Sequence, residues 1–357
     1  MEKTAYYING VGLISPQFTF DHAAGFLSQP QEYTGNSLYC VTPDFKAYIN
    51  PVQLRRLSRF LRIGLSAAII CLRDAKNENP DGIITSTGYG FLIDTAKFLV
   101  ELLTQQGKHL TPTYFMQSTY NALGGLVALY VKCSGYNTTH VSKGVAFETA
   151  LMDAMMQLEL NESMHFLVGS YDEADPVLFA VNSKAGHYKL EPVPSLTLFE
   201  SKTTGSLQGE GAAFFFISAQ KNEQTYCRLR DIRMMYKPTD ELVTVLHDFL
   251  TVNAMSVSDI DVVITGASGD VVNDRNINAL CDTAFRQVVQ LRFKHLCGEY
   301  CTASSFGVWM GASVLKNQYI PAVARANQIP APASINTVLI VNQYMARNYS
   351  FILLAGM

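Results

Sequence analysis

The chain has 357 residues, with 27 Lys and Arg against 30 Asp and Glu, so its formal net charge is −3. Hydrophobic residues make up 48% and charged residues only 16%, below the roughly 25% that is typical of globular domains. A chain this long and this poor in charge can bury a large core, which excludes intrinsic disorder. The near-neutral balance also argues against nucleic-acid binding as the main function.

The sequence favours a cytoplasmic protein. No apolar run approaches the roughly 18 to 20 residues that span a bilayer, and residues 1–16 lack the pattern of a signal peptide. The seven cysteines form no Cys-x-x-Cys pair, which is typical of reduced thiols rather than of a disulfide framework. Cys297 and Cys301 lack a matching His/Cys couple elsewhere, so we expect no zinc site and no metal.

Strand and helix patterns alternate along the chain. In chain order the first cycle predicts strands over 6–14, 81–90, 137–142 and 164–169, and helices over 54–75, 94–105, 120–132 and 147–160. The second cycle predicts strands over 227–235, 259–266 and 288–292 and helices over 240–252, 273–285 and 305–318, before a closing hairpin of 335–342 and 348–354. Such alternation predicts a parallel α/β sheet, and two similar cycles indicate two fused copies of one unit.

Common catalytic and cofactor motifs are absent from the places where they would function. No Gly-x-Gly-x-x-Gly, P-loop, Gly-x-Ser-x-Gly or His-Glu-x-x-His occurs at a predicted strand–turn–helix, so no cofactor is expected. The neighbouring acids Asp172 and Glu173 are interpreted as loop or capping carboxylates.

Four segments, in the right order, resemble β-ketoacyl synthases, the condensing enzymes of the thiolase fold. They are the opening strand at 9–16 (Asn-Gly-Val-Gly-Leu-Ile-Ser-Pro), 167–173 (Leu-Val-Gly-Ser-Tyr-Asp-Glu), 208–216 (Gln-Gly-Glu-Gly-Ala-Ala-Phe-Phe-Phe) and 294–299 (Lys-His-Leu-Cys-Gly-Glu). The resemblance implies a thiolase-like α/β fold of two fused halves, layered α-β-α-β-α with mostly parallel mixed sheets. Residues 1–220 would form the synthase-like half and residues 221–357 the thiolase-like half.

Enzymes of this family need a cysteine thiolate at a helix N-terminus and two imidazoles that assist decarboxylation and stabilise an oxyanion. The resemblance places the nucleophile at Gly144 and the two imidazoles at Thr265 and Glu299, and of the family's functional residues only Lys294 is retained. The family's glycine-rich loop is also eroded at 342–347, which reads Asn-Gln-Tyr-Met-Ala-Arg. Glycine cannot be acylated, and Glu299 has the wrong charge to stabilise an oxyanion.

Synthase-like chains without the cysteine resemble chain-length-factor subunits, and this one is most similar to those of bacterial aryl-polyene and flexirubin-type pathways. The resemblance implies a non-catalytic subunit of fatty-acid or polyketide-type biosynthesis. Such a subunit pairs with an active ketosynthase, or with itself, works with acyl carrier protein and shapes the acyl tunnel. The sequence predicts an apolar tunnel lining around the elbow, and ordinary core packing is the alternative for the same side chains. These residues are Phe115, Met116, Phe147, Met152, Met155 and Met156, with Cys297 and Cys301 near the cavity.

Two alternatives stay open from the sequence. The chain could be an active acyltransferase or condensing enzyme with a relocated nucleophile, Cys297 or Cys301, and His295 as the base. It could instead be a scaffold that binds acyl groups or acyl carrier protein, since a group of arginines on one predicted helical segment would suit an acidic partner: Arg55, Arg56, Arg59 and Arg62.

Overall fold

The computed structural model describes residues 4–21 and 26–357, and its ten strands form one sheet in the order β3-β2-β4-β5-β1-β6-β10-β9-β7-β8. The strands of the first half are β1 (Tyr6–Ile14), β2 (Gly82–Thr87), β3 (Tyr136–Val141), β4 (His165–Asp172) and β5 (Gly211–Ser218). Those of the second half are β6 (Cys227–Tyr236), β7 (Val262–Thr265), β8 (Val289–Arg292), β9 (Thr337–Tyr344) and β10 (Asn348–Ala355). Read from its outer edge, the second half repeats the strand order of the first.

The helices connect these strands. Those of the first half are α1 (Pro51–Leu54), α2 (Arg59–Ala75), α3 (Leu92–Thr104), α4 (Pro112–Ser118), α5 (Ala122–Val131), α6 (Ala146–Leu160) and α7 (Pro176–Lys184). Those of the second half are α8 (Leu242–Val252), α9 (Arg275–Asp282), α10 (Lys294–Cys297) and α11 (Ser304–Asn317). Short 3-10 helices cover Phe45–Ala47, Ser195–Glu200, Val257–Asp259 and Ala322–Ala324.

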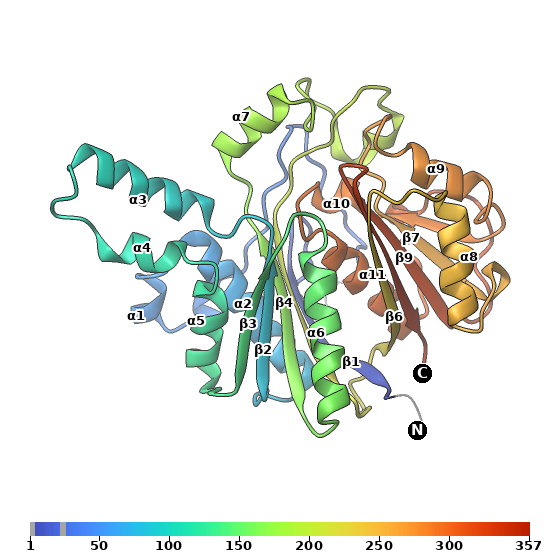
Figure 1. The fold of residues 1–357 in the computed structure, drawn as a ribbon, viewed down its shortest axis with the longest axis horizontal. Helices are drawn as coiled ribbons and strands as arrows, with labels where there is room; N and C mark the ends of the chain where they lie inside the picture. Colours follow the sequence, from blue (N-terminus) through green and yellow to red (C-terminus); the bar gives the residue numbers. More distant parts are fainter. Residues whose placement is uncertain (1–3, 22–25) are drawn as a thin grey trace.

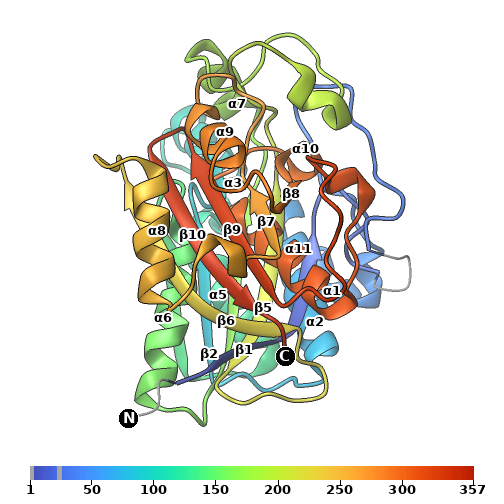
Figure 2. The same ribbon diagram turned by 90° about the vertical axis from the view of Figure 1, so that its right-hand side faces the viewer.

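Alternation along the strands divides the core among three helix layers. On β5, Phe215 belongs to the central cluster with α6 and α11, whereas Phe214 and Phe216 belong to the outer cluster with α2 and α5. On β10, Ile352 belongs to the central cluster and Phe351 to the outer cluster with α8 and α9. In Figures 1 and 2, α8 and α11 lie on opposite sides of β9. Because successive side chains of a strand point to opposite faces, both faces of each half-sheet are buried. The predicted α-β-α-β-α layering follows from this arrangement.

The two half-sheets join along a short seam. Strand β1 pairs with β6 only over Tyr6–Ile8, and the rest of β1 pairs with β5. This short pairing lets the half-sheets diverge, and α6 and α11 occupy the space between them. The predicted boundary at 220/221 falls in the connection between Ser218 and Cys227, and the independence of the two halves as domains stays a prediction.

The sheet is mixed, as the resemblance implied, but it contains more antiparallel pairing than "mostly parallel" suggests. The pairs β2–β3, β2–β4, β7–β8 and β7–β9 are parallel. The central pairs β4–β5, β5–β1, β1–β6, β6–β10 and β10–β9 are antiparallel. Each half therefore has a parallel outer part and an antiparallel inner part, because β1 and β5 of the first half run against their neighbours.

Most predicted elements are confirmed, and the differences have local causes. The helix predicted over 54–75 is divided, because α1 ends at Leu54 and α2 begins at Arg59 after the cap Ser58. Helices α4 and α7, which both carry a proline at the start, were not predicted. In α7, Asp175 caps the helix by accepting a hydrogen bond from the Leu178 N–H at 2.6 Å, so Asp175-Pro176 was a usable signal. Within residues 4–21 and 26–357, every helix is too short or too polar to cross a bilayer.

Candidate active-site region

The candidate site lies where strands of both halves end. Parallel strands of an open α/β sheet place ligand sites beyond their carboxyl ends, and here β2, β4 and β9 end beside the start of α11. Residues near these ends line a cavity of about 10 Å³, among them Tyr89 after β2, Tyr344 at the end of β9 and Cys301 just before α11. This volume is about the least that holds one water molecule, so side chains of the chain itself fill the region.

Gly144 forms the predicted elbow between β3 and α6, and the structure leaves it no room for a side chain. Its φ is +90°, a conformation that glycine adopts readily and other residues rarely do. A Cβ atom at this position would lie 2.7 Å from Cβ of Tyr344 and 2.9 Å from Cγ of the same ring. Backbone and packing therefore both exclude a cysteine here, as well as every other nucleophile.

The position expected for the first imidazole carries Thr265 at the end of β7. Thr265 is buried, and its Oγ1 donates a hydrogen bond to the carbonyl oxygen of Leu291 on the neighbouring strand β8 at 3.2 Å. The hydroxyl therefore forms a hydrogen bond within the sheet and is not directed to a substrate.

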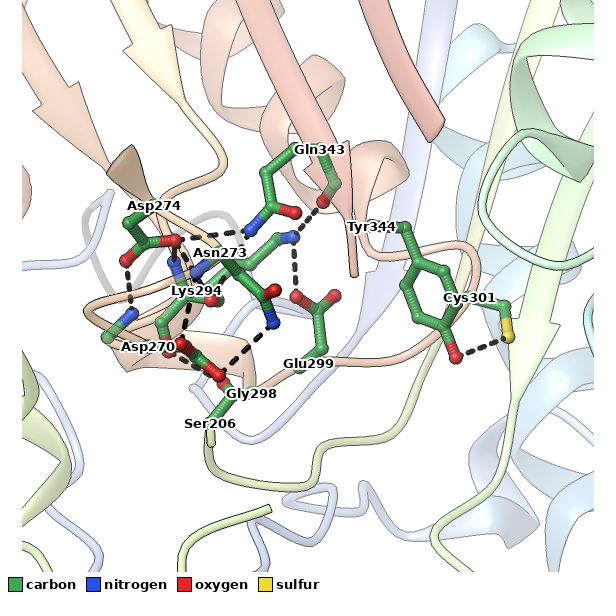
Figure 3. A network of polar contacts seen from close by, with 12 residues as sticks. Ser206, Asp270, Asn273, Asp274, Lys294, Gly298, Glu299, Cys301, Gln343 and Tyr344 are labelled. Atoms are coloured by element: carbon green, nitrogen blue, oxygen red, sulfur yellow. Dashed lines mark hydrogen bonds and ion pairs between the residues drawn. The ribbon is translucent and has the colours of Figure 1, made fainter. Parts of the chain in front are cut away.

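The position expected for the second imidazole carries Glu299, which forms a buried ion pair with Lys294. Nζ of Lys294 lies 2.8 Å from Oε2 of Glu299 and donates a second hydrogen bond to the carbonyl oxygen of Gln343 at 2.6 Å (Figure 3). Burial raises the pKa of Glu299 to about 7, and the Lys294 ammonium opposes this rise. The second oxygen, Oε1, has no hydrogen-bond partner among the described residues. A carboxyl group in this position repels an oxyanion when it is ionised.

Gln343 links the ion pair to a second carboxylate, that of Asp274. Nε2 of Gln343 donates to Oδ1 of Asp274 at 3.1 Å, and Asp274 also accepts the backbone N–H groups of Ser268 and Gly269, both at 2.7 Å (Figure 3). Burial raises the pKa of Asp274, and these hydrogen bonds oppose the rise. The Asp274 carboxylate therefore holds the loop that follows β7, and these hydrogen bonds use groups of the protein itself.

The structure speaks against a relocated nucleophile. Burial raises the pKa of the Cys301 thiol well above its usual range, and the nearby Asp172 carboxylate adds to this rise. Burial also raises the pKa of Cys297, whose Sγ donates to the Gly298 carbonyl oxygen at 3.3 Å. Burial lowers the pKa of His295 to about 4, and its Nε2 is bonded to the Val323 carbonyl oxygen at 2.9 Å. Activated cysteines instead have a lowered pKa, and the Lys294 ammonium near Cys297 does not offset the effect of burial on this thiol.

The predicted tunnel cluster does not form within this chain. Phe115 and Met116 lie exposed on α4, in the α3–α4 pair that projects from the body in Figure 1. Phe147 is fully buried on α6 and packs against Phe215, and Met152 is partly buried against the same core. The prediction grouped these side chains by their apolar character, but α4 carries two of them away from α6.

The predicted arginine group is divided by the fold. Arg59 forms a two-pronged ion pair with the fully buried Glu210 of the Gly-Glu-Gly segment, with Nη1 and Oε2 3.0 Å apart. Nε of Arg62 donates to the Leu57 carbonyl oxygen at 2.9 Å. Arg55 and Arg56 are exposed, and so is Arg59 despite its ion pair. Only part of the group is therefore available to a partner.

Asp172 has a larger structural role than the loop or capping role predicted for it. It is buried at the end of β4 and accepts hydrogen bonds from the hydroxyls of Thr87 and Thr302 and from the backbone N–H groups of Gly88 and Thr302, all within 2.8–3.0 Å. These donors come from both halves of the chain. The position of Asp172 at the end of a buried apolar strand was a sequence signal for a buried carboxylate. Its hydrogen-bond partners could not be predicted, because they are distant in sequence.

One family model and several solved structures match this chain. The model of the beta-ketoacyl synthase N-terminal domain matches residues 36–225, and the search of curated proteins gives no match. The fold matches "The ishigamide ketosynthase/chain length factor" at a TM-score of 0.80 and 16% identity, over 99% of this chain and 100% of the other.

Two further solved structures are similar over nearly their whole length. The complex of the ketosynthase ApeO with its chain length factor ApeC from Xenorhabdus doucetiae matches at a TM-score of 0.74 and 13% identity, over 99% of this chain and 98% of the other. A beta-ketoacyl synthase from Burkholderia phymatum STM815 matches at 0.73 and 13%, over 99% and 100%. At these identities the likeness concerns the fold, and it confirms the predicted thiolase-like architecture.

Proposed function

This chain belongs to the β-ketoacyl synthase family, and we propose that it is a non-catalytic, chain-length-factor-like subunit that pairs with an active ketosynthase. The observation that carries the proposal is the elbow at Gly144, where φ is +90° and a Cβ atom would lie within 3 Å of Tyr344. Acyl transfer to an enzyme requires a nucleophile at the elbow, and this elbow has no space for one.

The imidazole positions support the same conclusion. Thr265 and Glu299 occupy them, and the nearby Lys294 is engaged by Glu299 and by the Gln343 carbonyl oxygen. Decarboxylation of an extender unit needs donors directed at a developing oxyanion. Here the available cation is neutralised by a carboxylate, so we expect the chain to lack condensing activity by itself.

A partner is expected on the face of the first half that contains the outer strand β3. This strand is at the end of the sheet order, with β2 on one side only. Strand β3 itself, the neighbouring helices α3, α4 and α5, which Figure 1 shows on the same side, and α6 expose many apolar side chains: Leu99, Val100, Leu103, Phe115, Met116, Leu129, Tyr130, Tyr136, Val141, Met156 and Leu160. Monomeric proteins rarely expose such apolar area or an unprotected sheet edge.

We propose that the active ketosynthase occupies this apolar face. Similar solved structures are described as a ketosynthase with its chain length factor, and one as a ketosynthase with an acyl-carrier protein. By analogy, the acyl carrier protein would deliver acyl groups to the partner's cysteine. The exposed Phe115 and Met116 would then line the acyl tunnel from this side of the interface, which the isolated chain leaves open.

The test is co-expression of this chain with the ketosynthase encoded nearest to it, followed by acyl transfer from an acyl carrier protein. We expect a one-to-one complex in which only the ketosynthase cysteine is acylated. Acylation of this chain that is lost in Cys301→Ala or Cys297→Ala would establish the relocated nucleophile instead. Absence of both a complex and acylation would favour the scaffold.

A further inference from the structure

The ring of Tyr344 occupies the space in which an elbow side chain would lie. Tyr344 ends strand β9 and is only 3% exposed. Its Cβ, Cγ and Cδ1 atoms all lie within 3 Å of the point where a Cβ of Gly144 would be. The cavity that Tyr344 still leaves, about 10 Å³, is too small for any acyl group.

The backbone beside this ring is anchored by buried groups. Lys294 donates from Nζ to the carbonyl oxygen of Gln343, the residue before Tyr344, and the side chain of Gln343 is bonded to Asp274 and to the Ala346 N–H (2.8 Å). Met345 and Ala346 then take left-handed conformations, with φ of +54° and +50°. Non-glycine residues adopt this conformation at a cost, so the surrounding contacts must hold the turn in place.

The far end of the ring covers Cys301. Sγ of Cys301 donates to Oη of Tyr344 at 3.4 Å (Figure 3), and the thiol is buried. The opposite side of Cys301 is packed against the backbone of Gly88, where a Cβ atom would lie 2.2 Å from Cβ of Cys301. Tyr344 thus lies between the elbow and the one thiol that borders the small cavity.

We propose that Tyr344 is a plug that closes the elbow region of this chain to acyl groups, and that Lys294 is the positioning residue that holds it. If the chain pairs with a ketosynthase, as proposed above, the plug confines the growing acyl chain to the path that starts at the partner's cysteine. Lys294 then has a structural role, since it holds the turn that follows Tyr344.

The first test measures access to Cys301. The native full-length chain is alkylated with iodoacetamide, and peptide mapping by mass spectrometry follows each cysteine. Tyr344→Ala should raise the rate at Cys301 by about tenfold or more, since the covering ring is gone. The matched control Tyr344→Phe keeps the ring without Oη and should stay near the wild-type rate.

Cys227, fully buried in the central core, reports on general loosening and should stay protected in both variants. An unchanged Cys301 rate in Tyr344→Ala would overturn the proposal, and so would an equal rise in Tyr344→Phe. Lys294→Gln should also raise the Cys301 rate, and Lys294→Arg should partly restore protection, because an arginine can still donate to the Gln343 carbonyl oxygen.

The second test is a double-mutant cycle that remains informative if Tyr344→Ala loosens the fold. Gly144→Ala should lower the midpoint of thermal unfolding more in the wild-type background than in Tyr344→Ala, where the new methyl group no longer meets the ring. Equal losses in both backgrounds would show that only the φ of Gly144 matters and would refute the plug.

Both tests use this chain's own thiol and stability and need no partner. A chain with a protected Cys301 that forms no complex would refute the proposed subunit role and leave the plug standing. A chain that pairs with a ketosynthase although Cys301 reacts freely would refute the plug and leave the proposed subunit role standing.

Discussion

The region around Gly144, which residues of both halves build, and the face formed by α3, α4, α5, β3 and α6 of the first half differ in what their side chains contact. Around Gly144, packing and hydrogen bonds are made within the protein, through Tyr344, Lys294 and Glu299. The other face leaves large apolar side chains in solvent, such as Leu129 at 80% exposure. The site region is thus closed where a substrate would bind, and the outer face is open where a partner would bind.

The largest expected effect concerns the open face. Leu129→Glu on α5 places a charge in the apolar surface, so we expect loss of co-purification with the ketosynthase. Because Leu129 is exposed, the free energy of unfolding of the isolated chain should change by no more than about 0.5 kcal/mol. The control is Leu190→Glu, at a residue 71% exposed outside this face, which should preserve the complex. An equal loss of co-purification in Leu129→Glu and Leu190→Glu would show that the apolar face is not the surface that binds the ketosynthase.

The next effect concerns the buried ion pair. Lys294→Met leaves Glu299 without its partner, and removal of one member of a buried pair costs about 3–5 kcal/mol. We expect a loss near the lower end, because Glu299 can take up a proton, measured by urea unfolding. The control is Lys97→Met, in which a half-exposed lysine 3.4 Å from Asp94 is removed. That pair should contribute no more than about 1 kcal/mol, and an equally large loss there would contradict the account.

A smaller effect is expected at the contact between the two halves. Asp172→Asn replaces one acceptor oxygen by a donor that faces the donors of Thr87, Gly88 and Thr302. We expect a loss of about 1–3 kcal/mol in the free energy of unfolding. Thr302→Val removes one hydroxyl donor and should cost less than Asp172→Asn. The reverse order would show that the carboxylate does not carry this contact.

The smallest effect is a pH dependence at the edge of the closed region. Burial raises the pKa of Glu173 from 4.5 to about 7, so the folded state binds a proton that the unfolded state has released. The stabilisation from this proton is fully present below pH 4.5 and is lost as the pH rises through about 7.

Glu173→Gln keeps an acceptor for the Ile93 N–H, to which Oε1 is bonded at 2.9 Å, and should flatten this part of the profile. The exposed Glu162→Gln should leave it unchanged. Unfolding by urea at a series of pH values measures both. Burial also raises the pKa of Glu299 to about 7, so Glu299 keeps part of this slope in both variants. A slope as steep in Glu173→Gln as in the wild type would assign the proton of Glu173 to another group.

Local pattern predicted the sheet well, because strands buried on both faces have continuous apolar sequences. The runs at 164–169 and 348–354 illustrate this, and the structure has β4 at His165–Asp172 and β10 at Asn348–Ala355. The same logic failed for Phe115 and Met116, since an apolar side chain exposed on the surface has the same sequence signature as one in a core. The order of β1 and β5, which makes the centre of the sheet antiparallel, also has no local signal.

The sequence by itself predicted the elbow at Gly144, placed Glu299 where an imidazole was expected, and indicated that Lys294 is the family's retained lysine. These statements concern the identity of residues at positions located by nearby motifs. Only the tertiary structure showed that Tyr344, 200 positions beyond Gly144, fills the elbow, and that Lys294 is engaged by Gln343. Contacts of this kind depend on how the two halves pack around α6 and α11. The hydrophobic pattern along the sequence does not indicate which side chains come into contact when they are 200 positions apart.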